Sequence, residues 1–148
     1  MATLMALELP IDNLGQISLQ ELARGFFMWK AFQVRESVLV QGNLQSYRFD
    51  FLLSRNSPST PLQVADIGVK VIDWARTCGV NVILHFEQML EDVQPAIPQG
   101  MVVSNRFSSS ARSLATKAGI TLLSRGELVS IYRNQQISVN HLSQRERN

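Results

Sequence analysis

The sequence of 148 residues lacks several features that would fix its class directly. It contains one cysteine, Cys78, so an intramolecular disulfide and a zinc site built from cysteines are both excluded. Its two histidines, His85 and His141, have no partners at a metal-ligand spacing. There is no run of ~18 apolar residues to span a bilayer, and the first residues lack the basic segment of a signal peptide. These absences favour a cytoplasmic protein with no membrane segment.

The charge balance and the glycine pattern also carry little information. Lys and Arg total 14 against 12 Asp and Glu, and this net charge of +2 permits a nucleic-acid partner without requiring one. The phosphate-cradling pattern GxxxxGK does not occur, and no small-molecule cofactor is expected. Hydrophobic residues make up 45% of the chain, which is enough for one core. We therefore expect a single domain over residues 17–133, with a lead-in over 1–16 and a polar tail over 134–148.

Hydrophobic spacing predicts helices at about residues 19–30, 80–92, 108–118 and 124–132. Two of them begin at a capping box, in which a serine is followed three residues later by a glutamate. These boxes are Ser18 with Glu21 and Ser124 with Glu127. The third helix is followed by Gly119, at the position where a left-handed residue commonly ends a helix.

Strands are predicted at residues 34–40, 44–53, 62–74, 101–103 and 120–123. The first two flank a short turn that contains Gly42, which indicates a hairpin. Simple alternation along its second arm places four large residues on one face: Tyr47, Phe49, Phe51 and Leu53. Strands that first form a hairpin and then alternate with helices predict a mixed sheet covered on both faces. We therefore expect a three-layer α/β/α domain.

The strand LQVADIGVKVIDW, residues 62–74, carries polar side chains where a core strand would not. Alternation places Asp66 and Lys70 on the same face as Ile72, opposite an apolar face. In the preceding strand, Asp50 stands among hydrophobic residues. A buried carboxylate without partners costs several kcal/mol, so we expect Asp50 at an open edge, beside a cation or on a metal.

Four stretches resemble the PD-(D/E)xK nuclease superfamily, most closely its Mrr-type restriction endonuclease branch. They are ELARGFF, YRFDFLL, VKVIDW and residues 101–133. The resemblance implies a restriction-endonuclease-like fold and, as in many members, a homodimer. In this family a first-helix glutamate, a second-strand aspartate, and an acid or glutamine two residues before a lysine bind a divalent metal and position water. Glu21 and Asp50 occupy the first two places.

The third-strand motif departs from the family pattern. Aligned on Trp74, Lys70 stands where an acid or glutamine belongs, and Ile72 stands where the lysine belongs. The resemblance thus implies a nuclease fold that has lost catalysis and its metal, and that binds DNA or a partner protein. A protein-interaction subunit that binds no nucleic acid is a third class.

The alternative interpretation is a working Mg²⁺-dependent DNA endonuclease. Asp50, Asp66 and a migrated Lys70 would be its catalytic groups, and Glu21 and Asp50 would bind the metal. Structural roles remain open for the same residues. The capping box explains Glu21, and an ion pair with Lys70 or Arg48 would explain Asp50.

The stretch NRFSSSAR, residues 105–112, places serines and free backbone N–H groups at a helix start, between two arginines. Such a helix start is a phosphate site, although N-capping by Ser108 accounts for one of the serines. The candidate nucleic-acid contacts are Arg76, Arg106, Ser108, Ser109, Arg112 and Lys117. The aromatic residues Trp29, Tyr47 and Trp74 are expected in the core and not as platforms for bases.

Overall fold

The computed structural model describes residues 16–55 and 65–134. Most of the expected lead-in, most of the expected tail and the start of the third predicted strand lie outside these ranges. In chain order the elements are α2 (Leu19–Trp29), β1 (Phe32–Gln41), β2 (Ser46–Arg55), β3 (Ile67–Ile72), α3 (Val80–Asp92), β4 (Gln99–Ser104), α4 (Ser109–Ala118) and β5 (Ile120–Ser124). A helix over residues 125–134 follows β5.

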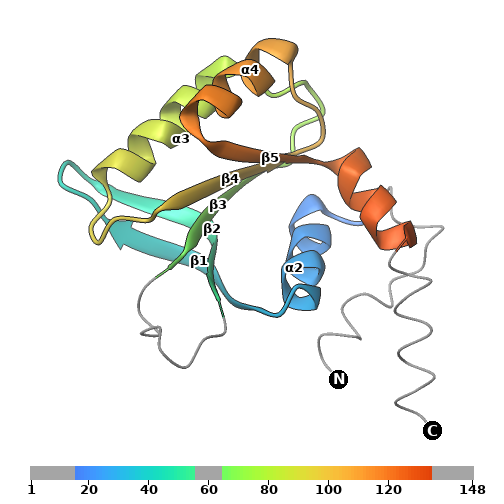
Figure 1. Cartoon of the computed structure of the whole chain (residues 1–148), viewed down its shortest axis with the longest axis horizontal. Helices are drawn as coiled ribbons and strands as arrows, with labels where there is room; N and C mark the ends of the chain where they lie inside the picture. Colours follow the sequence, from blue (N-terminus) through green and yellow to red (C-terminus); the bar gives the residue numbers. More distant parts are fainter. Residues whose placement is uncertain (1–15, 56–64, 135–148) are drawn as a thin grey trace, which may run out of the picture.

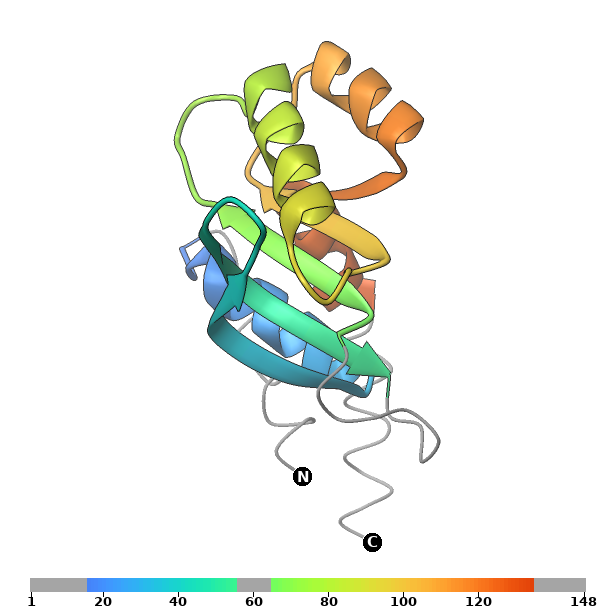
Figure 2. The same cartoon turned by 90° about the vertical axis from the view of Figure 1, so that its left-hand side faces the viewer.

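The strands form one sheet in the order β1-β2-β3-β4-β5, so each strand pairs with its neighbour in the chain. β1, β2 and β3 are antiparallel, and β3, β4 and β5 are parallel. Helices α3 and α4 cover one face, and α2 and the helix over 125–134 cover the other (Figure 1 and Figure 2). The expected three-layer α/β/α fold with a mixed sheet is therefore confirmed. Within the described ranges, no helix is long and apolar enough to cross a membrane.

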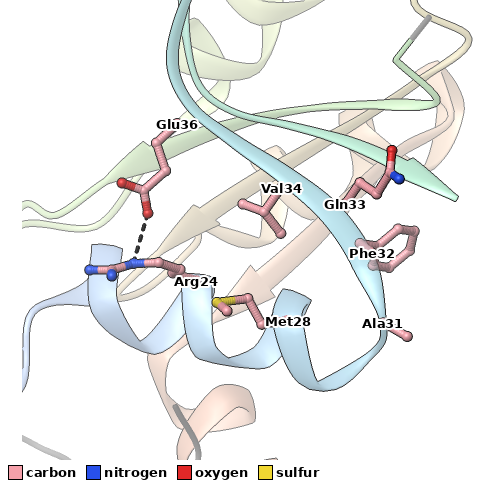
Figure 3. A pocket seen from close by; sticks show the side chains of 7 residues that line it. All are labelled: Arg24, Met28, Ala31, Phe32, Gln33, Val34 and Glu36. Carbon is pink, nitrogen blue, oxygen red and sulfur yellow. Dashed lines mark ion pairs between the residues drawn. The ribbon is translucent and has the colours of Figure 1, made fainter. Parts of the chain in front are cut away.

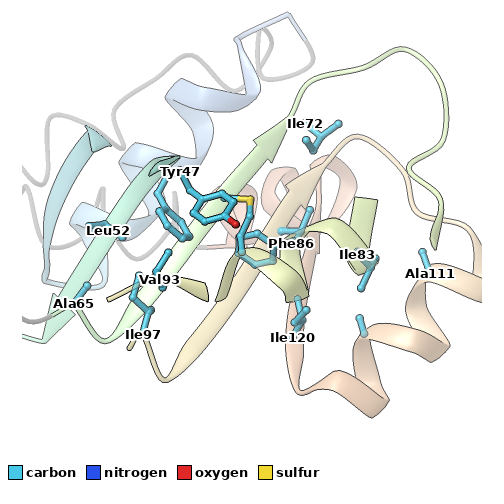
Figure 4. Packing of buried hydrophobic residues seen from close by; sticks show 14 residues of the cluster. Tyr47, Leu52, Ala65, Ile72, Ile83, Phe86, Val93, Ile97, Ala111 and Ile120 are labelled. Carbon is cyan, nitrogen blue, oxygen red and sulfur yellow. The ribbon is translucent and has the colours of Figure 1, made fainter. Parts of the chain in front are cut away.

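Each face of the sheet has its own hydrophobic core. On one side the strands pack against α2 and the last helix, through residues that include Leu22, Phe27 and Leu128. On the other side they pack against α3 and α4, through residues that include Ile83 and Phe86 (Figure 4). Because apolar groups leave water on both faces, the sheet is stabilised from two sides.

The hairpin of β1 and β2 changes faces in its middle. Phe51 packs against Phe27 of α2, with ring centroids 5.4 Å apart, whereas Phe49 packs against Phe86 of α3, at 6.1 Å. The expectation that Tyr47, Phe49, Phe51 and Leu53 share one face is therefore wrong. The change coincides with Ser37, where a φ of 51° interrupts the extended backbone of β1, and β2 changes face at the opposite position, Asp50.

The helix ends follow the sequence. The Oγ of Ser18 accepts a hydrogen bond from the backbone N–H of Glu21, at 3.1 Å. At the start of the last helix the capping box is reciprocal: the N–H of Glu127 donates to Ser124 Oγ, and the N–H of Ser124 donates to Glu127 Oε1. Gly119 ends α4 at a φ of 73°.

Candidate nucleic-acid interface

The two aspartates considered as catalytic groups lie beyond opposite ends of the short ladder between β2 and β3. Only three residue pairs form this ladder, Phe51–Leu53 with Ile67–Val69. At one end Asp50 Oδ2 accepts a hydrogen bond from Val71 N, at 2.6 Å, and at the other Asp66 Oδ2 accepts one from Arg55 N, at 2.7 Å. Val71, the partner of Asp50, lies five positions after Asp66, which corresponds to ~16 Å of extended chain. The two carboxylates do not share a site.

Lys70 lies on the same face as Ile72, as alternation predicts, and both line an apolar cavity against α3. Among the ion pairs of residues 16–55 and 65–134, none joins Asp50 to Lys70 or to Arg48, so the expected pairing is not formed. Asp50 instead bonds a backbone group. The structure thus does not bring Asp50, Asp66 and Lys70 together.

Glu21, considered as a metal ligand, is exposed on the first turn of α2. Its backbone takes part in the helix cap described above. Across the described ranges, no three His, Cys, Asp or Glu side chains gather so that they could hold a metal ion. Within the described ranges, Glu21 and Asp50 therefore do not form a metal site with a third His, Cys, Asp or Glu side chain.

A hollow of about 490 Å³ lies between α2 and β1 (Figure 3). None of the predicted site residues lines it. Its two charged side chains neutralise each other, because Arg24 Nε is 2.7 Å from Glu36 Oε1. This hollow is therefore a poor candidate for binding a charged ligand.

A polar network lies at the carboxyl ends of the parallel strands. Asp73, Asn105 and Arg125 are the first residues after β3, β4 and β5, respectively. Asn105 Nδ2 donates to Asp73 Oδ1, at 2.8 Å, and Arg125 Nε donates to Asn105 Oδ1, at 2.6 Å. This trio was not predicted from the sequence. A signal existed, since a polar residue directly after each strand of a parallel sheet falls at the edge where α/β proteins bind ligands.

The same network anchors the start of α2. Asp73 Oδ2 accepts from Leu19 N, at 3.2 Å, and Arg125 Nη1 donates to Ile17 O, at 2.7 Å. The hydrogen bond from Asn105 is the main cause that lowers the pKa of Asp73, and Leu19 N–H and Arg125 add to it against the opposing effect of desolvation. Asp73 is therefore ionised at neutral pH and holds three segments together.

Two loops lie side by side next to this network, residues 73–79 and 105–108. Asn105 Nδ2 donates to Trp74 O, at 2.7 Å, and Arg106 Nη2 donates to Ala75 O. Backbone bonds join Cys78 to the second loop, from Cys78 N to Arg106 O and from Ser108 N to Cys78 O. These bonds hold the first loop, which contains Arg76, beside the start of α4.

Five of the six candidate nucleic-acid contacts gather on these loops and the first turn of α4: Arg76, Arg106, Ser108, Ser109 and Arg112. We call these residues the arginine surface. Lys117 does not belong to it, because it lies in the last turn of α4, ~12 Å along the helix from Ser109.

Two arginines of this surface carry charge that no described acid neutralises. Arg112 is 3.5 Å from Glu127, but the ion pairs of the described residues include neither Arg76 nor Arg106. Backbone N–H groups add to the positive potential. Ser108 Oγ caps α4 through Ala111 N, at 3.0 Å, whereas the neighbouring start of α3, at Gly79, has no side-chain cap.

Trp74 was expected in the core, but its exposed fraction is 38%. The guanidinium carbon of Arg76 lies 4.2 Å from the centroid of its ring. The reason is its position: β3 ends at Ile72, so Trp74 belongs to the loop and not to the strand.

Comparisons with known proteins show the fold alone. No family model matches the chain, and no curated protein matches it. A solved structure described as a protein of unknown function, AF1548, is 17% identical, with a TM-score of 0.60. The match covers 74% of this chain and 63% of that one, so the chain spans less than two thirds of that protein. What this chain shares with that protein is the arrangement of an α/β domain.

Proposed function

We propose that this chain is a restriction-endonuclease-like domain that binds DNA without cleaving it. The observation that carries the proposal is the position of Arg76 and Arg106, which lie beside the start of α4 with no acidic partner among the described residues. Guanidinium groups and the N–H groups of a helix start are both suited to phosphate oxygens. The resemblance of four sequence stretches to the PD-(D/E)xK superfamily supports the same partner.

Loss of cleavage is supported by the residues at the family's catalytic positions. Lys70 and Ile72 stand in place of an acid and a lysine. Asp50 already accepts a hydrogen bond from Val71 N, and Asp66 lies beyond the other end of the strand pair. A Mg²⁺ ion held by a single carboxylate gains little over its hydration shell.

DNA binding is tested by fluorescence anisotropy with a labelled duplex over a range of salt concentrations. We expect affinity to fall steeply with salt, because phosphate contacts release counterions. Arg76→Ala should weaken binding to all sequences alike and reduce the slope of log affinity against log salt by about 1. Lys117→Ala removes a charge from the far end of α4 and should have a smaller effect. Equal losses in the two variants would contradict the placement of the interface, and no binding at low salt would favour a protein-interaction role.

The absence of cleavage is tested by incubating plasmid DNA with the protein and Mg²⁺ or Mn²⁺. We expect the plasmid to remain intact. Cleavage that Asp50→Ala abolishes would overturn this part of the proposal and restore the endonuclease interpretation.

A further inference from the structure

An apolar cavity of about 310 Å³ lies between β3 and α3. Ile72 and Phe86, two buried residues of the core cluster shown in Figure 4, belong to its lining, and Trp74 and Val82 also line it. Its volume is at the low end of the range of ligand pockets, about 300–1,000 Å³. The cavity is therefore large enough for a small ring system but not for a peptide segment.

Met89 and three side chains with polar ends complete the lining, to which these side chains contribute mainly carbon atoms. Asn81 and His85 are four residues apart on α3 and thus project from the same side of the helix, where both are exposed. Lys70 reaches the cavity from β3 and has no acidic partner among the described residues. An apolar cavity bordered by a few polar groups is a common form of ligand site, and an amine beside it favours an oxygen-rich or anionic ligand.

The cavity adjoins the arginine surface through Trp74. This side chain lines the cavity, and Arg76 lies against its ring, 4.2 Å from the centroid. A ligand that places a flat ring beside Trp74 would therefore bring an attached phosphate close to Arg76. Flat rings linked to phosphates are the repeating chemistry of single-stranded nucleic acid.

We propose that this cavity receives an unstacked base of single-stranded DNA while Arg76 binds the adjoining phosphate. The inference rests on the proposed function and deepens it. Trp74 and Phe86 provide aromatic and apolar contact for the ring. The amide of Asn81 and the imidazole of His85 can hydrogen-bond to polar atoms on its edge, and Lys70 can donate to a carbonyl oxygen of the base.

The test separates the base from the backbone with two labelled 12-nucleotide strands of equal charge. One is an oligothymidylate, and the other carries abasic deoxyribose at every position. We expect the full-length chain to bind the thymidine strand at least ~10-fold more tightly, because stacking of bases on aromatic side chains contributes strongly to affinity. Equal affinities for the two strands would overturn the inference and leave the proposed function standing.

Two matched variants of α3 locate the effect. Val82→Trp fills the cavity, whereas Leu84→Trp adds the same side chain two residues further on, at an exposed position that does not line it. We expect Val82→Trp to bring thymidine affinity down to the abasic value without changing abasic binding, and Leu84→Trp to keep the difference. Circular dichroism checks that both variants are folded. A thymidine preference that survives in folded Val82→Trp would overturn the cavity as its source. If neither strand binds at low salt while the labelled duplex does, the inference alone is overturned, whereas a lack of binding to the strands and to the duplex would overturn the proposed function itself.

Discussion

Asp50 stands in a strongly hydrophobic strand, and the structure gives its carboxylate a structural partner. Pairing between β2 and β3 stops at Phe51 and Val69, just before Asp50. The N–H of Val71 lies beyond that point, and the carboxylate accepts its hydrogen bond at 2.6 Å. A side-chain oxygen thus takes the place of a strand carbonyl where the two strands separate. The acid in this hydrophobic strand is thus explained by the geometry of the sheet.

This role predicts a specific pattern of stability. Asp50→Ala should lower the free energy of unfolding by about 1–3 kcal/mol, because the N–H of Val71 loses its acceptor. Asp50→Asn keeps an acceptor oxygen and should lose less. Urea denaturation of the three proteins measures the difference. An alanine variant more stable than the wild type would contradict the structural role and would point to a strained functional carboxylate.

At the scale of elements, the Asp73 network connects parts that are distant in the sequence. It joins the ends of β3 and β4, the first residue of the helix over 125–134 and the start of α2. It also lies directly beside the loops that carry the arginine surface. The position of that surface therefore depends on a carboxylate that lies outside it.

The lowered pKa of Asp73 predicts how stability depends on pH. A carboxyl group whose pKa is lower in the folded state than in the unfolded state, where it is about 3.9, stabilises the fold above that value. This contribution is lost as the pH falls through the lowered pKa. Asp73→Asn should therefore be less stable at pH 7 and lose less stability on acidification. Urea denaturation from pH 7 to pH 2 tests this, and parallel profiles for the two proteins would contradict it.

The elements themselves could largely be predicted from the sequence, because their signals are local. The predicted bounds of α3 are the observed ones, Val80–Asp92, and the reciprocal capping box of Ser124 and Glu127 was recognisable as a pattern. The face change of the hairpin was not predictable, because a serine in a strand gives no sign that its φ is positive. The Asp73 trio depends on the parallel register of β3, β4 and β5, which local patterns do not specify.

At the scale of the whole molecule, one sheet separates two hydrophobic cores. Leu22 belongs to the core under α2, and Ile83 belongs to the core under α3 and α4. Both side chains are fully buried. Packing defects in one core are thus shielded from the other by the sheet.

We expect substitutions in the two cores to act independently. Leu22→Ala should cost about 2–5 kcal/mol and Ile83→Val about 0.5–1.5 kcal/mol. In the double variant these costs should add to within ~0.5 kcal/mol, because the residues share no core. As a control, Phe27→Leu and Phe51→Leu should not add, since their rings touch at a centroid distance of 5.4 Å. Urea denaturation gives all the values, and a coupling between Leu22 and Ile83 as large as in the control would contradict two separate cores.

The positive φ of Ser37 also affects how β1 can pair with a strand of another molecule. β1 is an edge of the sheet, and a long extended edge is a template on which the strand of another molecule can add. Ser37 divides β1 into residues 32–36 and residues 38–41. Phe32 and Val34 pack on one side of the sheet, and Val38 and Val40 pack on the other. A foreign strand could follow only one of these halves. The interruption at Ser37 thus also shortens the straight edge that another strand could extend.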